Sequence, residues 1–320
     1  MFAALGRGRS VFLGHLRVCT LVLLAGWLAL GVAALQVGPR AMAADDPAGA
    51  AKELPEPEDV TLNGSRGVNI VATYYPGMHG KDTLPVLLLH MHKGSRKDYH
   101  ELAVALQEVG HAVMVPDLRG HGDSPLYDQK NVRIEVDKLR REHFQASMED
   151  VELCKRFLMD KNNSGELNID KLCVVGAEFG AILAVNWTAV DWSAIPLPAM
   201  KQGQDVKAVL LLSPKYTMEG VTINDGLKSP ALQKEILIGI ISGKNDADAR
   251  RLDKAFGGFR PGGSGGKRRE QTVFYTQLNT TLEGTKMITA ADLNVIPKIR
   301  RFIDLVAQKN IPWQDRKLLD

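Results

Sequence analysis

The stretch KLCVVGAEFGAILAV, residues 171–185, decides the fold of this chain. It begins with a short apolar run of leucine, cysteine and valine at 172–175, continues through a glycine-flanked turn, and ends in small, helix-forming residues. This order predicts a strand, a tight turn and a helix. Gly176 and Gly180 stand two residues before and two after Glu178. A very sharp turn requires this spacing, because a Cβ at either position would collide with neighbouring backbone.

Apolar runs and helical patterns alternate along the rest of the chain. The predicted strands are 60–62, 68–75, 84–90, 112–116, 172–175, 206–212, 235–241 and 272–278. The predicted helices cover 98–109, 140–159, the segment after Gly180 and 291–307. Continuous apolar strands that alternate with helices indicate a mostly parallel central sheet with helices on both faces.

Three motifs make the chain resemble the α/β-hydrolase superfamily. His90-Met91-His92-Lys93-Gly94-Ser95 is similar to the family's H-G-x-x-G-S oxyanion loop. DLRGHGDS at 117–124 matches its D-x-R-G-x-G-x-S turn, and Gly176 and Gly180 match the G-x-S-x-G nucleophile elbow. The likeness covers roughly residues 60–308. It implies an α/β-hydrolase fold with a reduced lid, which we place at residues 187–205, over the elbow.

The catalytic positions that this resemblance implies are filled unusually. The nucleophile position holds Glu178 instead of serine, and the acid position holds Asp246. The histidine expected after the last strand is missing, and we assign its position to Thr285, with Lys286 as the neighbouring choice. The last histidine of the chain is His143, so no histidine follows the elbow. The family's order of nucleophile, acid and histidine cannot be completed.

The oxyanion hole of the family corresponds here to the backbone amides of His92 and Phe179, and Met91 replaces the family's glycine. We expect the Glu178 carboxylate to be held by these amides, by Lys93 and by the partial positive charge of the helix N-terminus. This predicts a pKa below the ordinary glutamate value of about 4.3.

Glu178 has three interpretations: a structural carboxylate in a lost active site, a nucleophile as in the aspartate-elbow haloalkane dehalogenases and epoxide hydrolases, or a ligand-binding carboxylate. His90, His92 and His121 are further cleft candidates. The latter two could replace the missing base, although such histidines more often order loops. The resemblance therefore implies a pseudo-hydrolase that binds a small molecule or protein partner in the former cleft. The alternative is a hydrolase that uses Glu178 as nucleophile or base on an ester, epoxide or halide-type substrate. Standard serine hydrolase activity is not expected.

Residues 1–44 have the pattern of an export signal. Three arginines precede an apolar run at 18–37, and Ala41-Met42-Ala43 supplies small residues for cleavage. An uncleaved anchor over the same run is the alternative, since about 18 apolar residues can span a bilayer. An acidic, proline-rich linker at 45–58 leads into a domain at 59–320. We expect a periplasmic or extracellular protein that contacts a membrane only if the anchor remains.

The remaining features favour no cofactor. A net charge of +3 and a 45% hydrophobic composition are ordinary for a globular protein and give no indication of nucleic-acid binding. Residues 160–171 resemble a calcium loop, but Lys171 replaces the required bidentate acid, so no metal is predicted. Cys154 and Cys173 either form a disulfide after export or stay as buried free thiols. The glycine-rich segment 256–270 is predicted to be a surface loop.

Overall fold

The structure is a computed structural model that describes residues 53–195, 201–258 and 273–317. The export signal predicted at 1–44 and most of the loop predicted at 256–270 lie outside these residues. Within the part of the chain that is described, no helix is long and apolar enough to cross a membrane.

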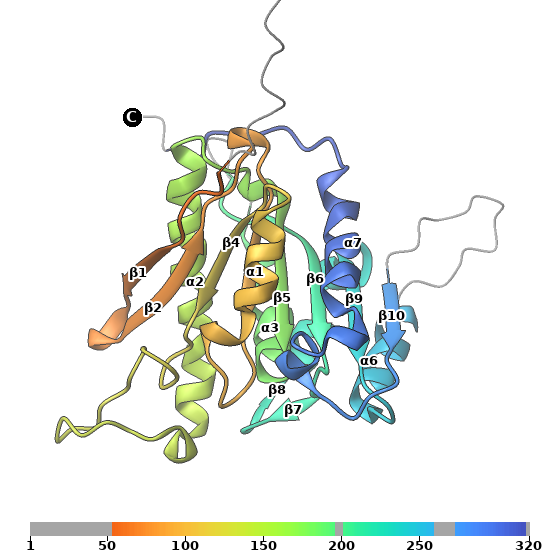
Figure 1. Ribbon diagram of the computed structural model, residues 1–320. Helices are drawn as coiled ribbons and strands as arrows, with labels where there is room; N and C mark the ends of the chain where they lie inside the picture. The colour runs from red at the N-terminus through yellow and green to blue at the C-terminus, as the bar shows by residue number, and fades with distance from the viewer. Residues whose placement is uncertain (1–52, 196–200, 259–272, 318–320) are drawn as a thin grey trace, which may run out of the picture. The chain divides into compact units, whose positions relative to one another are not determined.

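An eight-stranded sheet forms the centre of the domain, with the order β1-β2-β4-β3-β5-β6-β9-β10 (Figure 1). Its strands are β1 (Glu58–Asn63), β2 (Asn69–Tyr75), β3 (Pro85–Leu89), β4 (Ala112–Pro116), β5 (Leu172–Ala177), β6 (Val206–Leu212), β9 (Leu237–Ser242) and β10 (Val273–Gln277). Strand β2 is antiparallel to both β1 and β4, whereas all pairings from β4 to β10 are parallel. The mostly parallel sheet predicted from the sequence is therefore confirmed.

Helices cover both faces of this sheet (Figure 1). The helices α2 (Arg141–Asn163), α3 (Phe179–Ser193) and α6 (Ala247–Gly258) share one apolar core with the sheet. The helices α1 (His100–Gln107) and α7 (Val295–Ala307) form the core on the opposite face. Alternate residues of a strand point to opposite faces, so Leu87 contributes to the first core and Val86 to the second. The buried strands are apolar throughout for this reason.

Helix boundaries differ from the predictions at two places. The helix predicted over 98–109 begins as a 3-10 turn, Arg96–Tyr99, before α1. The helix predicted over 291–307 is divided by Asn294, whose φ of 49° separates the 3-10 turn Ala291–Leu293 from α7. A left-handed residue cannot continue a right-handed helix, so the regular part starts after it.

The lid prediction at 187–205 is wrong. Residues 187–193 are the last turns of α3, which starts at the carboxyl end of β5 and runs back along the sheet. The carboxylate of Asp191 accepts hydrogen bonds from the amides of Asp205 and Val206 at the start of β6, at 2.8 and 3.2 Å. The end of α3 and the start of β6 therefore lie at the amino ends of the parallel strands, whereas the elbow lies at their carboxyl ends. A small insertion follows the carboxyl end of β6 instead, and its elements are β7 (Thr217–Met218), β8 (Val221–Thr222), α4 (Asn224–Leu227) and α5 (Pro230–Lys234).

The two cysteines lie in different cores. Cys154 belongs to the core under α2, and Cys173 to the core under α7, with the sheet between them. Both are buried free thiols. A disulfide between them is excluded by this placement, and the expectation of buried free thiols is confirmed.

The C-terminal segment is tied to the calcium-loop-like segment by buried polar contacts. The guanidinium of Arg316 forms ion pairs with Asp170, at 2.6 Å, and with Asp205. The side chain of Asn162 donates to the carbonyl of Gln314 at 3.0 Å and accepts from the amide of Ile169 at 3.0 Å. The side-chain oxygen of Asn162, at the third position of the calcium-loop-like segment, is thus engaged by the chain itself.

Candidate functional site

Glu178 forms the sharp turn between β5 and α3. Its backbone has φ 48° and ψ −104°, a conformation that residues other than glycine seldom adopt. Two backbone hydrogen bonds hold it there: its amide donates to the carbonyl of Leu212 at 3.0 Å, and its carbonyl accepts from the amide of Ala181 at 3.1 Å. Strained backbone of this kind clusters at functional sites, and it is the geometry of a nucleophile elbow.

The flanking glycines are required by close backbone approach. A Cβ built on Gly176 would lie 2.2 Å from the carbonyl oxygen of Gly180. A Cβ on Gly180 would lie 2.2 Å from the carbonyl oxygen of Leu89, in β3. Both approaches are far below van der Waals contact and involve backbone that cannot move aside. The steric argument made from the sequence is confirmed.

The Glu178 side chain lies against the loop that follows β10. A Cβ built on Gly284 would lie 3.3 Å from Cγ of Glu178, 3.5 Å from its Cδ and 2.9 Å from the sulfur of Met91. Gly284 also has φ 57°, which disfavours any other residue. The glutamate therefore occupies space beside a glycine and a methionine.

The predicted pKa of Glu178 is wrong in sign. Burial raises the pKa of this carboxyl, the charges of Glu283 and Asp246 raise it further, and Lys215 and Lys286 lower it. Within the described residues, the carboxylate accepts no hydrogen bond from the amides of His92 or Phe179. Desolvation is therefore opposed only by lysine charges, and it prevails.

Lys93 does not hold the carboxylate either. Its ammonium group forms an ion pair with Asp137 at the surface, so the expected contact with Glu178 is wrong. The amides of His92 and Phe179 have no hydrogen-bond acceptor within the described ranges. Both amides can therefore donate a hydrogen bond to a bound group, as the resemblance to an oxyanion hole implies.

A second carboxyl group lies in the same cluster. Asp246 precedes α6, and its Oδ1 accepts a hydrogen bond from the amide of Ala249 at 2.9 Å, as a helix cap does. Its Oδ2 is buried without a partner in the described part of the chain. Burial raises the pKa of Asp246. The charges of Asp246 and Glu178 both act on Lys215, so the nucleophile and acid positions meet around this lysine.

Lys215 and Glu283 complete the cluster, and sequence analysis missed both. The ammonium group of Lys215 lies 2.8 Å from Oε2 of Glu283. Lys215 follows β6, where the family motifs indicate no functional residue. Gly284 was missed as well, although it directly precedes Thr285, the position assigned to the missing histidine.

Thr285 and Lys286 lie beside this cluster in different environments. Thr285 is buried, and its hydroxyl donates to Oδ2 of Asp98, at 3.4 Å, in the turn before α1. Lys286 is exposed, and its charge reaches Glu178. Gly284, one residue before Thr285, lies against the Glu178 side chain.

His90 orders two loops. Its ring is fully buried, its Nε2 accepts from the amide of Leu118 at 2.9 Å, and its Nδ1 therefore carries the proton that is donated to the carbonyl of Met91 at 2.7 Å. Burial lowers the pKa of His90 to about 4, which keeps it neutral. It joins the oxyanion loop to the turn after β4.

The ring of His121 contacts the rings of His90 and His92. Nδ1 of His121 donates to the carbonyl of Arg119 at 3.1 Å, and its Nε2 faces Nδ1 of His92 at 3.4 Å. Nε2 of His92 lies 3.9 Å from a carboxylate oxygen of Glu219, in the turn between β7 and β8. Burial lowers the pKa of both rings. Their contacts connect the oxyanion loop to its neighbours.

The DLRGHGDS turn is stabilised by its own carboxylate. Oδ1 of Asp117 accepts from the amide of Arg96 at 2.6 Å, and Oδ2 accepts from the amide of Asp123 at 2.9 Å. Oγ of Ser124 accepts from the amide of Val71 at 2.9 Å. These residues support the loop that carries His90 and His92.

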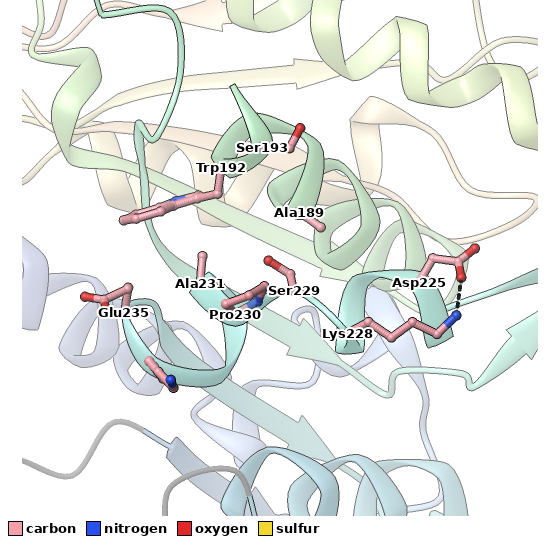
Figure 2. A pocket seen from close by; sticks show the side chains of 10 residues that line it. Ala189, Trp192, Ser193, Asp225, Lys228, Ser229, Pro230, Ala231 and Glu235 are labelled. Carbon is pink, nitrogen blue, oxygen red and sulfur yellow. Dashed lines mark hydrogen bonds and ion pairs between the residues drawn. The ribbon is translucent and has the colours of Figure 1, made fainter. Parts of the chain in front are cut away.

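A hollow of about 630 Å³ lies along the second half of α3, against α4 and α5 (Figure 2). Trp192 and Ala189 face it from α3, and Lys228, paired with Asp225 at 3.0 Å, lies on its other side. Ala189 is eleven residues beyond Glu178, which corresponds to about 16 Å along a helix axis. This hollow is separate from the cluster around Lys215.

Comparisons with known proteins agree with this geometry. The profile of the family described as serine aminopeptidase, S33, matches residues 82–233. A search of curated proteins found no significant match. Among solved structures, an esterase of Pyrococcus furiosus superposes with a TM-score of 0.55 at 14% identity, over 79% of this chain and 91% of its own.

Two further structures are similar. The dienelactone hydrolase of Anabaena variabilis has a TM-score of 0.54 at 14% identity and covers 79% of this chain and 99% of its own. The esterase of Pyrobaculum calidifontis has a TM-score of 0.56 at 16% identity and covers 80% of this chain and 88% of its own. At these identities the likeness to solved structures concerns the fold. Together with the family profile, the elbow and the sheet order, it leads to one conclusion: the chain has the α/β-hydrolase fold, and its residues 82–233 match the S33 serine aminopeptidase family.

Proposed function

We propose that the protein is a catalytically inactive α/β-hydrolase-fold protein that binds a small molecule or a protein partner at the cluster of Glu178, Lys215, Asp246 and Glu283. One observation carries the proposal. The elbow presents a carboxylate, and Gly284 lies against it in the loop that would carry the catalytic histidine. A serine hydrolase needs a hydroxyl and an imidazole within hydrogen-bond reach of each other, and neither group is supplied here.

The environment of Glu178 is suited to binding a ligand. Two carboxyl groups with raised pKa values and the ammonium group of Lys215 form a polar cluster at the carboxyl edge of the sheet. Ligands of open α/β sheets bind at this edge. The unpartnered Oδ2 of Asp246 remains able to accept a hydrogen bond from a bound group.

The test of inactivity is direct. The purified protein is treated with a fluorophosphonate probe and with p-nitrophenyl esters, beside an active serine esterase as the control. We expect no labelling and no ester turnover above buffer. Glu178→Ser restores the G-x-S-x-G motif and is still expected to be inactive, because no histidine activates the new hydroxyl. Stoichiometric labelling of any serine in the wild type would overturn the proposal.

A second candidate is a hydrolase with unusual machinery, and the raised pKa of Glu178 is the observation that favours it. Catalytic carboxyl groups are often tuned upward by burial and by neighbouring acids. In this candidate the ionised carboxylate attacks a carbon of an alkyl halide or epoxide and forms an ester. The carbon–halogen bond breaks and halide leaves, or one ring C–O bond breaks and the epoxide oxygen stays on the alkyl group, where it takes up a proton from water.

This candidate predicts a covalent adduct. Incubation with an alkyl halide or an epoxide, followed by mass spectrometry of peptides, would then find an ester on Glu178 and on no other carboxyl group. Glu178→Gln is the matched control, since an amide cannot form the adduct. Turnover that survives Glu178→Ala would eliminate the role.

Export also remains a proposal. The basic start, the apolar run and the small residues at 41–43 support cleavage after Ala43 or Ala44. Determination of the N-terminal residue of the protein isolated from its natural host tests it. A mature chain that still begins at Met1 would favour the anchor over residues 18–37.

A further inference from the structure

A second hollow, of about 350 Å³, lies between α7 and the end of the sheet formed by β9 and β10. Its apolar lining comes from three strands and the helix, and its members are Leu210, Gly239, Ile240, Ile241, Phe274, Phe302 and Leu305. Phe274 and Phe302 contact each other edge to face, with ring centroids 6.0 Å apart. Ligand cavities are typically about 300–1,000 Å³ and mainly apolar, so this hollow has the size for one small ligand.

The strand pattern explains why apolar side chains are open here. β10 is the last strand of the sheet, and alternate residues place Phe274 and Thr276 on the face that carries α7. At Gly239 a Cβ would lie 2.9 Å from the ring of Phe302, so this glycine lets the ring rest directly on β9. The helix thus packs closely over β9, and the half-buried Phe274 lines the hollow beside it.

The two charged residues that line the hollow among the described residues are both positive. Lys298 and Arg301 are three residues apart on α7, which places them on one side of the helix. The ammonium group of Lys298 donates to the carbonyls of Leu293 and Asn294, at 3.1 and 3.2 Å. The side chain of Arg301 has no ion pair or hydrogen bond with any part of the chain that the structure describes. The nearby acid of α7, Asp304, acts on His111 instead, and none of the described residues that line the hollow is acidic.

We propose that this hollow binds a medium-chain fatty acid, with the alkyl chain against Phe274 and Phe302 and the carboxylate at Arg301. The guanidinium group matches a carboxylate with two parallel hydrogen bonds, and Lys298 adds charge from the next turn. Thr276 supplies a hydroxyl to the same site. A cavity of about 350 Å³ suits the alkyl chain of one medium-chain fatty acid. This site is independent of the function proposed for the elbow.

The binding test uses the full chain and calorimetric titration with dodecanoate. We expect saturable binding of one molecule. Dodecyltrimethylammonium has the same chain and the opposite charge, and it is expected to bind at least tenfold more weakly if the cations select the head group. Acetate, which lacks the chain, is expected not to bind. Absence of dodecanoate binding, or equal affinity for both amphiphiles, would overturn the proposal.

Three variants locate the site. Arg301→Gln is expected to weaken dodecanoate binding about tenfold, which is the lower end for a hydrogen bond to a charged group, because Arg301 is exposed. Lys309→Gln removes an exposed positive charge just beyond the C-terminal end of α7, outside the hollow, and is expected to leave the affinity unchanged. Thr276→Trp keeps both cations but fills the hollow, and it is expected to abolish binding. Circular dichroism confirms that each variant is folded. Full affinity in Thr276→Trp would show that the chain binds elsewhere.

Discussion

Replacing Glu178 with glutamine tests whether burial or hydrogen bonding governs this carboxyl group. The pKa of Glu178 is raised in the folded protein, so folding favours the protonated form. Stability from this group is fully present below the unfolded pKa and is lost as the pH rises through the folded pKa. At neutral pH the ionised carboxylate therefore destabilises the fold. Glutamine has nearly the same shape without the charge, and we expect Glu178→Gln to be more stable than the wild type near pH 7.

The size of the effect follows from the environment of the side chain. The Glu178 side chain is half-buried, and its carboxylate accepts no hydrogen bond within the described residues. A buried polar group without partners costs about 1–3 kcal/mol, and charged groups cost more. Partial exposure and the attraction of Lys215 and Lys286 reduce this cost, so we expect a gain of about 1 kcal/mol. For a domain of this size such a gain raises the melting temperature by about 2–4 °C.

The assay is thermal melting of wild type and variant at about pH 7 and about pH 3.5, on either side of the ordinary carboxyl pKa. The difference should be present at the higher pH and shrink at the lower one. Glu56→Gln, at an exposed position, is the matched control and should show neither effect. If Glu178→Gln is less stable than wild type near pH 7, the carboxylate is held by groups that favour its charge, and the argument from desolvation fails.

Three further substitutions test the fold around the site, each by denaturant unfolding. Gly180→Ala places a Cβ 2.2 Å from the carbonyl oxygen of Leu89 and should cost about 3 kcal/mol or more; a loss below about 1 kcal/mol would contradict the steric need for glycine. Gly284→Ala, at φ 57° and against a flexible methionine, should cost less, about 1 kcal/mol. Arg316→Ala removes one cationic partner from the buried carboxylates of Asp170 and Asp205, which keep lysine partners, and should cost about 1.5–3 kcal/mol, whereas exposed Lys317→Ala should be neutral; equal effects of the two would refute the role of the buried ion pairs.

The sequence alone determined the architecture, the glutamate at the elbow and the absence of a later histidine. Alternating apolar runs and helical patterns depend on local periodicity, so the sheet and its covering helices were predictable. The elbow was predictable because Gly176 and Gly180 answer a local steric need. The absence of histidine after Glu178 is a property of chain order and needs no structure.

The tertiary structure decided how the site is arranged. The sign of the Glu178 pKa depends on a balance between burial and the charges of Lys215 and Glu283, which are distant in sequence and carry no motif. The lid was misplaced for a related reason. A segment that contains tryptophan and proline can lie at either end of the strands, and its composition does not tell which. The direction of α3 places the end of this helix at the amino ends of the strands, away from the elbow. Local pattern determines which elements form, whereas desolvation and electrostatic fields arise only when those elements are packed together.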